Sequence, residues 1–212
     1  HYSADDPSGK ALNKKGLQEE MGLPVRAEVP LLSIVSRLVS HKGFDLIKTV
    51  FDELLWNNDI QVVVLGSGEW QYEDFFKRMQ EKYPQKLALR LGFLPDLAQK
   101  IYAGSDIFLM PSKSEPCGLS QMVALRYGSI PIVRETGGLK DSIFDSGNGE
   151  GNGFTFANYN AHDMLHTIYR ALEGYSNQEG WQILVKRAMH CDYSWKSAAG
   201  EYIKMYKEVC GG

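Results

Sequence analysis

The feature that most constrains the fold is a strand–turn–helix pattern over residues 106–128. Residues 106–111 form a short apolar run that ends in proline, which is typical of a buried strand. A helix is then predicted, ending at Gly128, from apolar residues at helical spacing: Leu119, Met122, Val123 and Leu125. Residues 130–133 predict the next strand. The turn over residues 112–118 is therefore expected at the carboxyl edge of a parallel sheet.

This turn has two interpretations. Unbonded N–H groups at the start of a helix carry partial positive charge, and Gly118 has no side chain to keep an anion from the backbone. A phosphate group is the natural ligand of such a turn. Alternatively, Glu115 caps the helix of an ordinary strand–turn–helix unit. The spacing by itself does not decide between the two.

Strands and helices alternate along the rest of the chain. The other predicted strands cover residues 31–35, 60–65, 87–91 and 154–156, the last as an edge strand. Such alternation predicts an α/β fold with a doubly wound, mostly parallel, Rossmann-like sheet and helices on both faces. We expect residues 29–190 to form this domain, with residues 1–28 as a lead-in or linker rather than a core element. A final helix is predicted within residues 191–212.

Composition narrows the classes of function. The chain has 212 residues, 43% of them hydrophobic, which suffices for one good core. The formal net charge of −3 provides no basic field for nucleic acid, and no apolar run approaches the ~20 residues of a membrane helix. Three widely spaced cysteines favour a reducing compartment. Because the sequence starts at His1 rather than methionine, we expect the native amino terminus to lie upstream.

Several polar or aromatic residues follow predicted strands. Arg37 and Lys42 come after the first strand, Gly68 after the second, Phe93 after the third, and Glu115 after the fourth. Ligands of doubly wound sheets bind outside the carboxyl ends of the strands. Two cations, an anion-binding turn and a carboxylate suit a ligand that bears phosphate, and Phe93 could stack on its base. The alternative for the two cations is a solvated turn.

Other motifs are weaker. Residues 66–71 begin a dinucleotide-binding glycine pattern, but Gln71 occupies the last glycine position and no suitably placed acidic residue follows, which disfavours a nicotinamide dehydrogenase. The sequence contains no P-loop. His162 and His166 lie one helical turn apart without an evident third ligand, so we expect a surface helix and no metal site. Cys117 has no base nearby in sequence and is interpreted as a small residue in a tight turn.

Four motifs resemble those of bacterial glycogen synthase and plant starch synthase. They are Ser36-Arg-Leu-x-x-x-Lys-Gly43, Leu65-Gly-Ser-Gly68, Ser114-Glu-Pro-Cys-Gly-Leu-Ser-Gln121 and Arg134-Glu-Thr-Gly-Gly-Leu139. The match extends over the whole chain, and the third motif is highly specific to that family. The resemblance implies the carboxyl-terminal, donor-binding half of a GT-B glycosyltransferase. Such an enzyme transfers glucose from ADP-glucose to the non-reducing end of an α-1,4-glucan with retention of configuration.

The resemblance also implies residue roles. Arg37 and Lys42 would hold the donor diphosphate, and Glu115 would contact the transferred glucose, although a nucleophilic role for this carboxylate stays open. ADP-glucose would be the donor substrate. Neither a cofactor nor a metal is expected, because fixed cations and helix amides can stabilise the leaving diphosphate. The nucleotide sugar would further be bound by Gly68, Phe93, Cys117, Gly118, Leu119 and Ser120.

Two departures from the wider superfamily matter. The position eight residues after Glu115 holds Val123 instead of a second glutamate, as in the glycogen synthase branch. The amino-terminal domain with its acceptor groove is missing, so we expect the glucan to bind mainly there, the helix in residues 191–212 to pack toward it, and this chain to be inactive alone. Alternatives are a non-catalytic nucleotide-sugar-binding module or a GT-B transferase for another donor. The bacterial interpretation implies the cytoplasm, and the plant one the plastid.

Overall fold

The computed structural model describes residues 1–211. At its centre is a six-stranded sheet in the order β3-β2-β1-β4-β5-β6, in which every neighbouring pair is parallel. The predicted doubly wound, Rossmann-like sheet is confirmed, and the strand over residues 154–156 does lie at an edge. The strands are β1 (Leu31–Val35), β2 (Gln61–Gly66), β3 (Leu87–Leu91), β4 (Ile107–Met110), β5 (Ile130–Arg134) and β6 (Phe154–Phe156).

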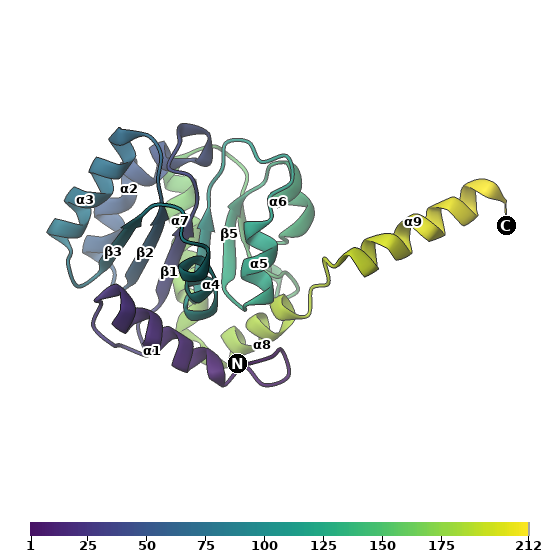
Figure 1. Cartoon of the computed structure of the whole chain (residues 1–212), viewed down its shortest axis with the longest axis horizontal. Helices are drawn as coiled ribbons and strands as arrows, with labels where there is room; N and C mark the ends of the chain where they lie inside the picture. The colour runs from purple at the N-terminus through teal and green to yellow at the C-terminus, as the bar shows by residue number, and fades with distance from the viewer. Residues whose placement is uncertain (212) are drawn as a thin grey trace.

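Helices cover both faces of the sheet (Figure 1). One face carries α2 (Phe44–Asn57), α3 (Trp70–Lys82) and α7 (Ala161–Ser176). The other carries α1 (Gly9–Met21) and α4 (Pro95–Gly104), with α5 (Ser120–Arg126) in contact with α4. The short helix α6 (Gly137–Ser142) follows β5, and α8 (Gln178–Met189) contacts both α5 and α7.

The two faces explain why the strands are apolar without alternation. In β2, Val62 and Val64 belong to the core beneath α2 and α3, whereas Val63 and Leu65 belong to the core beneath α1 and α4. A strand buried on both sides needs apolar side chains at every position. This is the reason that continuous apolar runs predicted the strands correctly.

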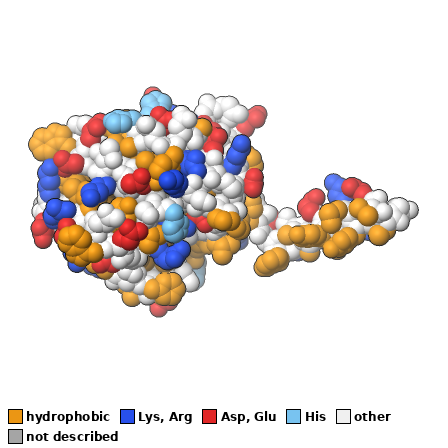
Figure 2. Space-filling model, turned by 90° about the horizontal axis from the view of Figure 1, so that it is seen from above, with side chains coloured by type: hydrophobic (Ala, Val, Ile, Leu, Met, Phe, Trp, Pro, Cys, Tyr) orange, Lys and Arg blue, Asp and Glu red, His pale blue; other side chains and the backbone are white. Residues whose placement is uncertain are grey.

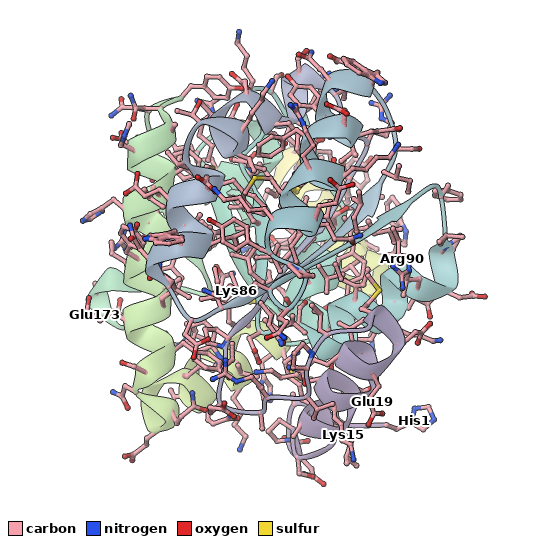
Figure 3. The ribbon with its side chains drawn as sticks, turned by 90° about the vertical axis from the view of Figure 1, so that its left-hand side faces the viewer. His1, Lys15, Glu19, Lys86, Arg90 and Glu173 are labelled. Atoms are coloured by element: carbon pink, nitrogen blue, oxygen red, sulfur yellow. The ribbon has the colours of Figure 1, made fainter. Side chains whose placement is uncertain are left out.

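The expectation that residues 1–28 form a lead-in rather than a core element is wrong for α1. Leu17 and Met21 are buried against Ile101 of α4, while Lys15 and Glu19 lie on the outer side of the helix (Figure 3). The buried stripe has few apolar residues because Lys14 and Gln18 complete it. That composition conceals the amphipathic pattern on which the sequence interpretation relied.

Lys14 is satisfied inside this polar part of the core. Its ammonium lies 2.7 Å from the Asp106 carboxylate and donates to the carbonyl of Ala27 at 3.0 Å and to the hydroxyl of Tyr175 at 3.0 Å. Buried charges are tolerated when they are paired in this way. Helix α1 is therefore part of the core structure and covers one face of the sheet.

The last helix, α9 (Trp195–Cys210), projects away from the body of the molecule (Figure 1). None of its side chains is buried, and Trp195 and Val209 are 89% and 79% exposed. Figure 2 shows apolar side chains gathered along the projecting helix. Within residues 1–211, no helix has both the length and the apolar character needed to cross a membrane. The packing of α9 toward another domain stays a prediction.

Candidate functional site

The strand order reverses between β1 and β4, and this reversal sets the position of the candidate site. In doubly wound sheets, the loops that diverge at such a point leave a crevice outside the carboxyl ends of the strands. The loop after β1 carries Arg37 and Lys42, and the loop after β4 carries Glu115. The structure therefore brings the three predicted catalytic candidates to one edge of the sheet.

Gly43 allows these two loops to touch. It follows the 3-10 turn η1 (Ser40–Lys42) and has a φ of 83°, a left-handed conformation that favours glycine. A Cβ atom at this position would lie 2.2 Å from the carbonyl oxygen of Pro111. The carbonyl of His41 accepts a hydrogen bond from the N–H of Lys113 at 2.9 Å. This backbone contact places Lys42 directly beside the loop that carries Glu115.

Lys42 and Glu115 form an ion pair at this edge of the sheet. The Lys42 ammonium donates to Glu115 Oε2 at 2.5 Å, and the two side chains are 17% and 11% exposed. The hydroxyl of Ser112 lies 3.4 Å from the same oxygen. Helix α5 has Leu119 as its N-cap and no side-chain cap. The helix-cap interpretation of Glu115 is therefore wrong, because its carboxylate faces Lys42 instead of the helix amides.

The loop after β5 supports the Glu115 loop from the other side. A Cβ atom on Gly137 would lie 2.2 Å from the Glu115 carbonyl oxygen, and one on Gly138 would lie 1.9 Å from that of Cys117. The Gly138 N–H donates to the Glu115 carbonyl at 3.1 Å. Arg134 adds a hydrogen bond from Nε to the Ser112 carbonyl at 3.0 Å. The Arg134–Leu139 motif, which the sequence singled out only by resemblance, thus holds this loop in place.

The turn into α5 leaves backbone donors free. Gly118 has a φ of 73° and Ser120 begins the helix. Within residues 1–211, the N–H groups of Leu119 and Ser120 make no hydrogen bond to the protein. Cys117 is exposed, and its Sγ is 3.6 Å from the Gly118 carbonyl. The four residues predicted to bind the nucleotide sugar here thus lie together beside Glu115.

Gly68 and Phe93 lie toward the β2 and β3 side of the same edge. A Cβ atom on Gly68 would lie 2.3 Å from the carbonyl oxygen of Leu38, and the Gly68 N–H donates to Glu73 Oε1 at 2.9 Å. Gly68 is therefore needed for close contact between the first two loops. The N–H of Gly68 is thus already bonded to a carboxylate of the chain, which argues against a pyrophosphate at this turn and so against the dehydrogenase alternative. Phe93 is 89% exposed.

The remaining candidates have simpler surroundings. Arg37 is exposed and forms no ion pair within the part of the chain that the structure describes. In residues 1–211, no group of three or more His, Cys, Asp or Glu side chains is arranged to hold a metal ion. Gln121, named in the sequence only as the end of a motif, is fully buried behind the turn. The hydrophobic pattern cannot reveal a buried glutamine in the first turn of a helix. Its burial depends on backbone carbonyls that accept its hydrogen bonds, and these are seen only in the structure.

The fold and the site define a Rossmann-like α/β domain with a lysine–glutamate pair at the switch point of its sheet. The chain belongs to the glycosyl transferases group 1 family, whose model matches residues 21–184. Glycogen synthase of Bacillus anthracis is 52% identical over 210 residues, which are 98% of this chain and 44% of that protein. Glycogen synthase of Bacillus licheniformis is 50% identical over 214 residues, again with 44% of its length covered. The chain thus spans less than half the length of these relatives.

Solved structures agree with the sequence relatives. The catalytic domain of starch synthase IV from Arabidopsis thaliana, bound to ADP and acarbose, superposes with a TM-score of 0.87 at 36% identity. The match covers 100% of this chain and 45% of that one. Sucrose-phosphate synthase from Thermosynechococcus elongatus shares the fold, with a TM-score of 0.66 at 17% identity over 92% of this chain. The resemblance to glycogen and starch synthases is confirmed.

Proposed function

We propose that this chain is the donor-binding domain of a glycogen or starch synthase that transfers glucose from ADP-glucose to an α-1,4-glucan with retention. The observation that carries the proposal is the Lys42–Glu115 pair at the β1/β4 switch point. It supplies a cation for phosphate and a carboxylate for sugar within one crevice. The likeness to a starch synthase bound to ADP and acarbose supports the choice of ligand.

The chemistry of transfer fits these groups. Cleavage of the bond between glucose and phosphate builds negative charge on the leaving diphosphate and positive charge on the sugar ring. The negative charge on the diphosphate would be stabilised by Arg37, Lys42 and the free N–H groups of the turn. Glu115 would orient the sugar hydroxyls or favour the positive ring. A nucleophilic role in a double displacement is the alternative for this carboxylate.

The complete reaction also needs an acceptor and exclusion of water. We propose that the glucan binds mainly outside this chain and that a second domain closes over the crevice. The exposed apolar side of α9, including Tyr202 and Tyr206, supports its packing against that domain. For a bacterial protein of this kind we propose the cytoplasm.

Nucleotide binding by this chain tests the proposal directly. Calorimetric titration with ADP, ADP-glucose, UDP, UDP-glucose and NAD, with and without a chelator, is expected to show preference for the two adenosine diphosphate ligands and no effect of the chelator. Lys42→Ala should weaken ADP binding, whereas Lys48→Ala, on the exposed surface of α2, should not. Binding of NAD as tight as that of ADP, or loss of binding with the chelator, would contradict the proposal.

A further inference from the structure

Gln121 is a buried polar residue to which the proposed chemistry gives no role. Its side chain lies behind the turn that precedes α5, with a relative exposure of 0%. Nε2 donates to the carbonyl of Gly118 at 2.9 Å and to that of Cys117 at 3.3 Å, and it lies 3.1 Å from the hydroxyl of Ser142. Oε1 is buried and, among residues 1–211, has no hydrogen-bond partner. All the hydrogen bonds of this side chain are therefore made by its amide nitrogen.

These contacts fix the direction of two peptide groups. In a trans peptide the C=O and the N–H of the following residue point in opposite directions. Because Gln121 draws the carbonyl of Cys117 toward the core, the N–H of Gly118 points away from it. The same holds for the carbonyl of Gly118 and the N–H of Leu119. One side chain thus turns two adjacent backbone donors outward.

We propose that Gln121 is a positioning residue that aims the N–H groups of Gly118 and Leu119 at the distal phosphate of a nucleoside diphosphate. The inference rests on the proposed function and adds a residue to the same site. Gly118 fits this role, since its φ of 73° favours glycine and a Cβ atom there would lie 2.5 Å from Gln121 Oε1. Turn and glutamine therefore pack as one unit.

Neither of two near-isosteric replacements reproduces the contact. Leucine fills a similar volume but has no donor for the two carbonyls. Glutamate would place a carboxylate against those same carbonyl oxygens and repel them. The unpartnered Oε1 is itself unfavourable, because a buried acceptor without a partner loses its hydration. The favourable contacts at this position therefore come from the donor end of Gln121, which bonds the carbonyls of Cys117 and Gly118.

Gln18 provides a matched control. It is also 0% exposed with an unpartnered Oε1, and its Nε2 donates to the Arg26 carbonyl at 3.0 Å and to Gln61 Oε1 at 2.7 Å. It lies in α1, beside the first residue of β2 and hence at the opposite end of the strands from the crevice. Replacing either glutamine by leucine makes the same chemical change in an equally buried place, but only one of them faces the turn.

The experiment measures binding of ADP and AMP to this chain by calorimetry, together with melting temperature, for wild type, Gln121→Leu and Gln18→Leu. We expect both variants to melt at a changed temperature, while only Gln121→Leu loses about tenfold in ADP affinity. Its AMP affinity should change by less than about twofold, because the distal phosphate is absent. Gln121→Asn, which is one methylene too short to reach Gly118, should show the same loss of the ADP-over-AMP preference.

Two failures are distinguishable. If the wild-type chain does not prefer ADP to AMP, the proposed function fails and this inference fails with it. If wild type prefers ADP and the folded Gln121 variants keep that preference, only the role of Gln121 is overturned. An equal loss of ADP and AMP affinity in Gln121→Leu would also overturn it, since a general loosening of the fold explains that pattern.

Discussion

Substitution of Glu115 by glutamine tests whether the Glu115 carboxylate and a donor phosphate compete for Lys42. Lys42 donates to Glu115 Oε2 at 2.5 Å, and both side chains are less than one-fifth exposed. A donor phosphate that takes Lys42 as its partner must therefore replace or share this carboxylate. Glutamine keeps the shape of the side chain and removes its negative charge.

The expected size of the effect follows from the contact. A hydrogen bond between charged groups contributes about 1.5–3 kcal/mol, and one with a neutral acceptor roughly half of that. Glu115→Gln should therefore remove about 1 kcal/mol of competition for Lys42, so that ADP binds about fivefold more tightly. In the complete enzyme kcat should instead fall severely, because we propose that this carboxylate acts on the sugar in the transition state.

Calorimetric titration of this chain with ADP measures the change in ADP affinity. Glu135→Gln is a suitable control, since Glu135 lies just after β5 at the same edge, is exposed and accepts a hydrogen bond from Thr155 at 2.7 Å. It removes one negative charge without touching Lys42. The reasoning is refuted if Glu115→Gln binds ADP no more tightly than wild type, or if Glu135→Gln tightens binding by the same amount.

Three further outcomes are expected. Lys42→Ala should weaken ADP binding by roughly ten- to a hundred-fold, because a charge-assisted contact to phosphate is lost, and an unchanged dissociation constant would contradict this. This chain alone should incorporate little labelled glucose into glucan; activity comparable with that of a full-length synthase would place the acceptor site within it. Although burial opposes ionisation of Asp145, hydrogen bonds from the N–H groups of Thr155 and Gly147 and from Arg170 hold the pKa of its carboxyl below the usual range. Asp145→Asn should therefore lower the free energy of unfolding at pH 7. Urea titrations should show this difference shrinking as the pH falls below about 4, where the unfolded carboxyl protonates, and vanishing only below the lowered pKa of the folded protein.

Apolar runs and the alternation of strands with helices were sufficient to predict the sheet and the edge that carries the candidate site. The strand over residues 31–35 and those that follow were predicted because strands buried on both faces must be apolar throughout. The parallel sheet then followed from the alternation with helices, and its carboxyl edge predicted where Arg37, Lys42 and Glu115 would gather. Their proximity to one another needed only the rule that parallel strands end at the same edge.

Contacts between residues far apart in the sequence could not be predicted from these local patterns. The sequence does not predict that α1 is part of the core, because Lys14 and Gln18 lie on its buried side. These polar side chains can be buried there because Asp106 and Gln61 bind them. The dual role of Glu115, as a sugar candidate and as the present partner of Lys42, depends on loops 73 positions apart in sequence.

The sequence by itself determined the class of fold, the family and the edge of the sheet that carries the candidate site. Tertiary structure alone decided that Glu115 faces Lys42 rather than the helix amides, that Gly68 packs on Leu38, and that Gln121 orients the turn. The physical reason is range. Periodicity and turn chemistry act over a few residues, whereas the direction of a side chain or carbonyl in a crevice is set by close packing between loops that meet only after the sheet has formed.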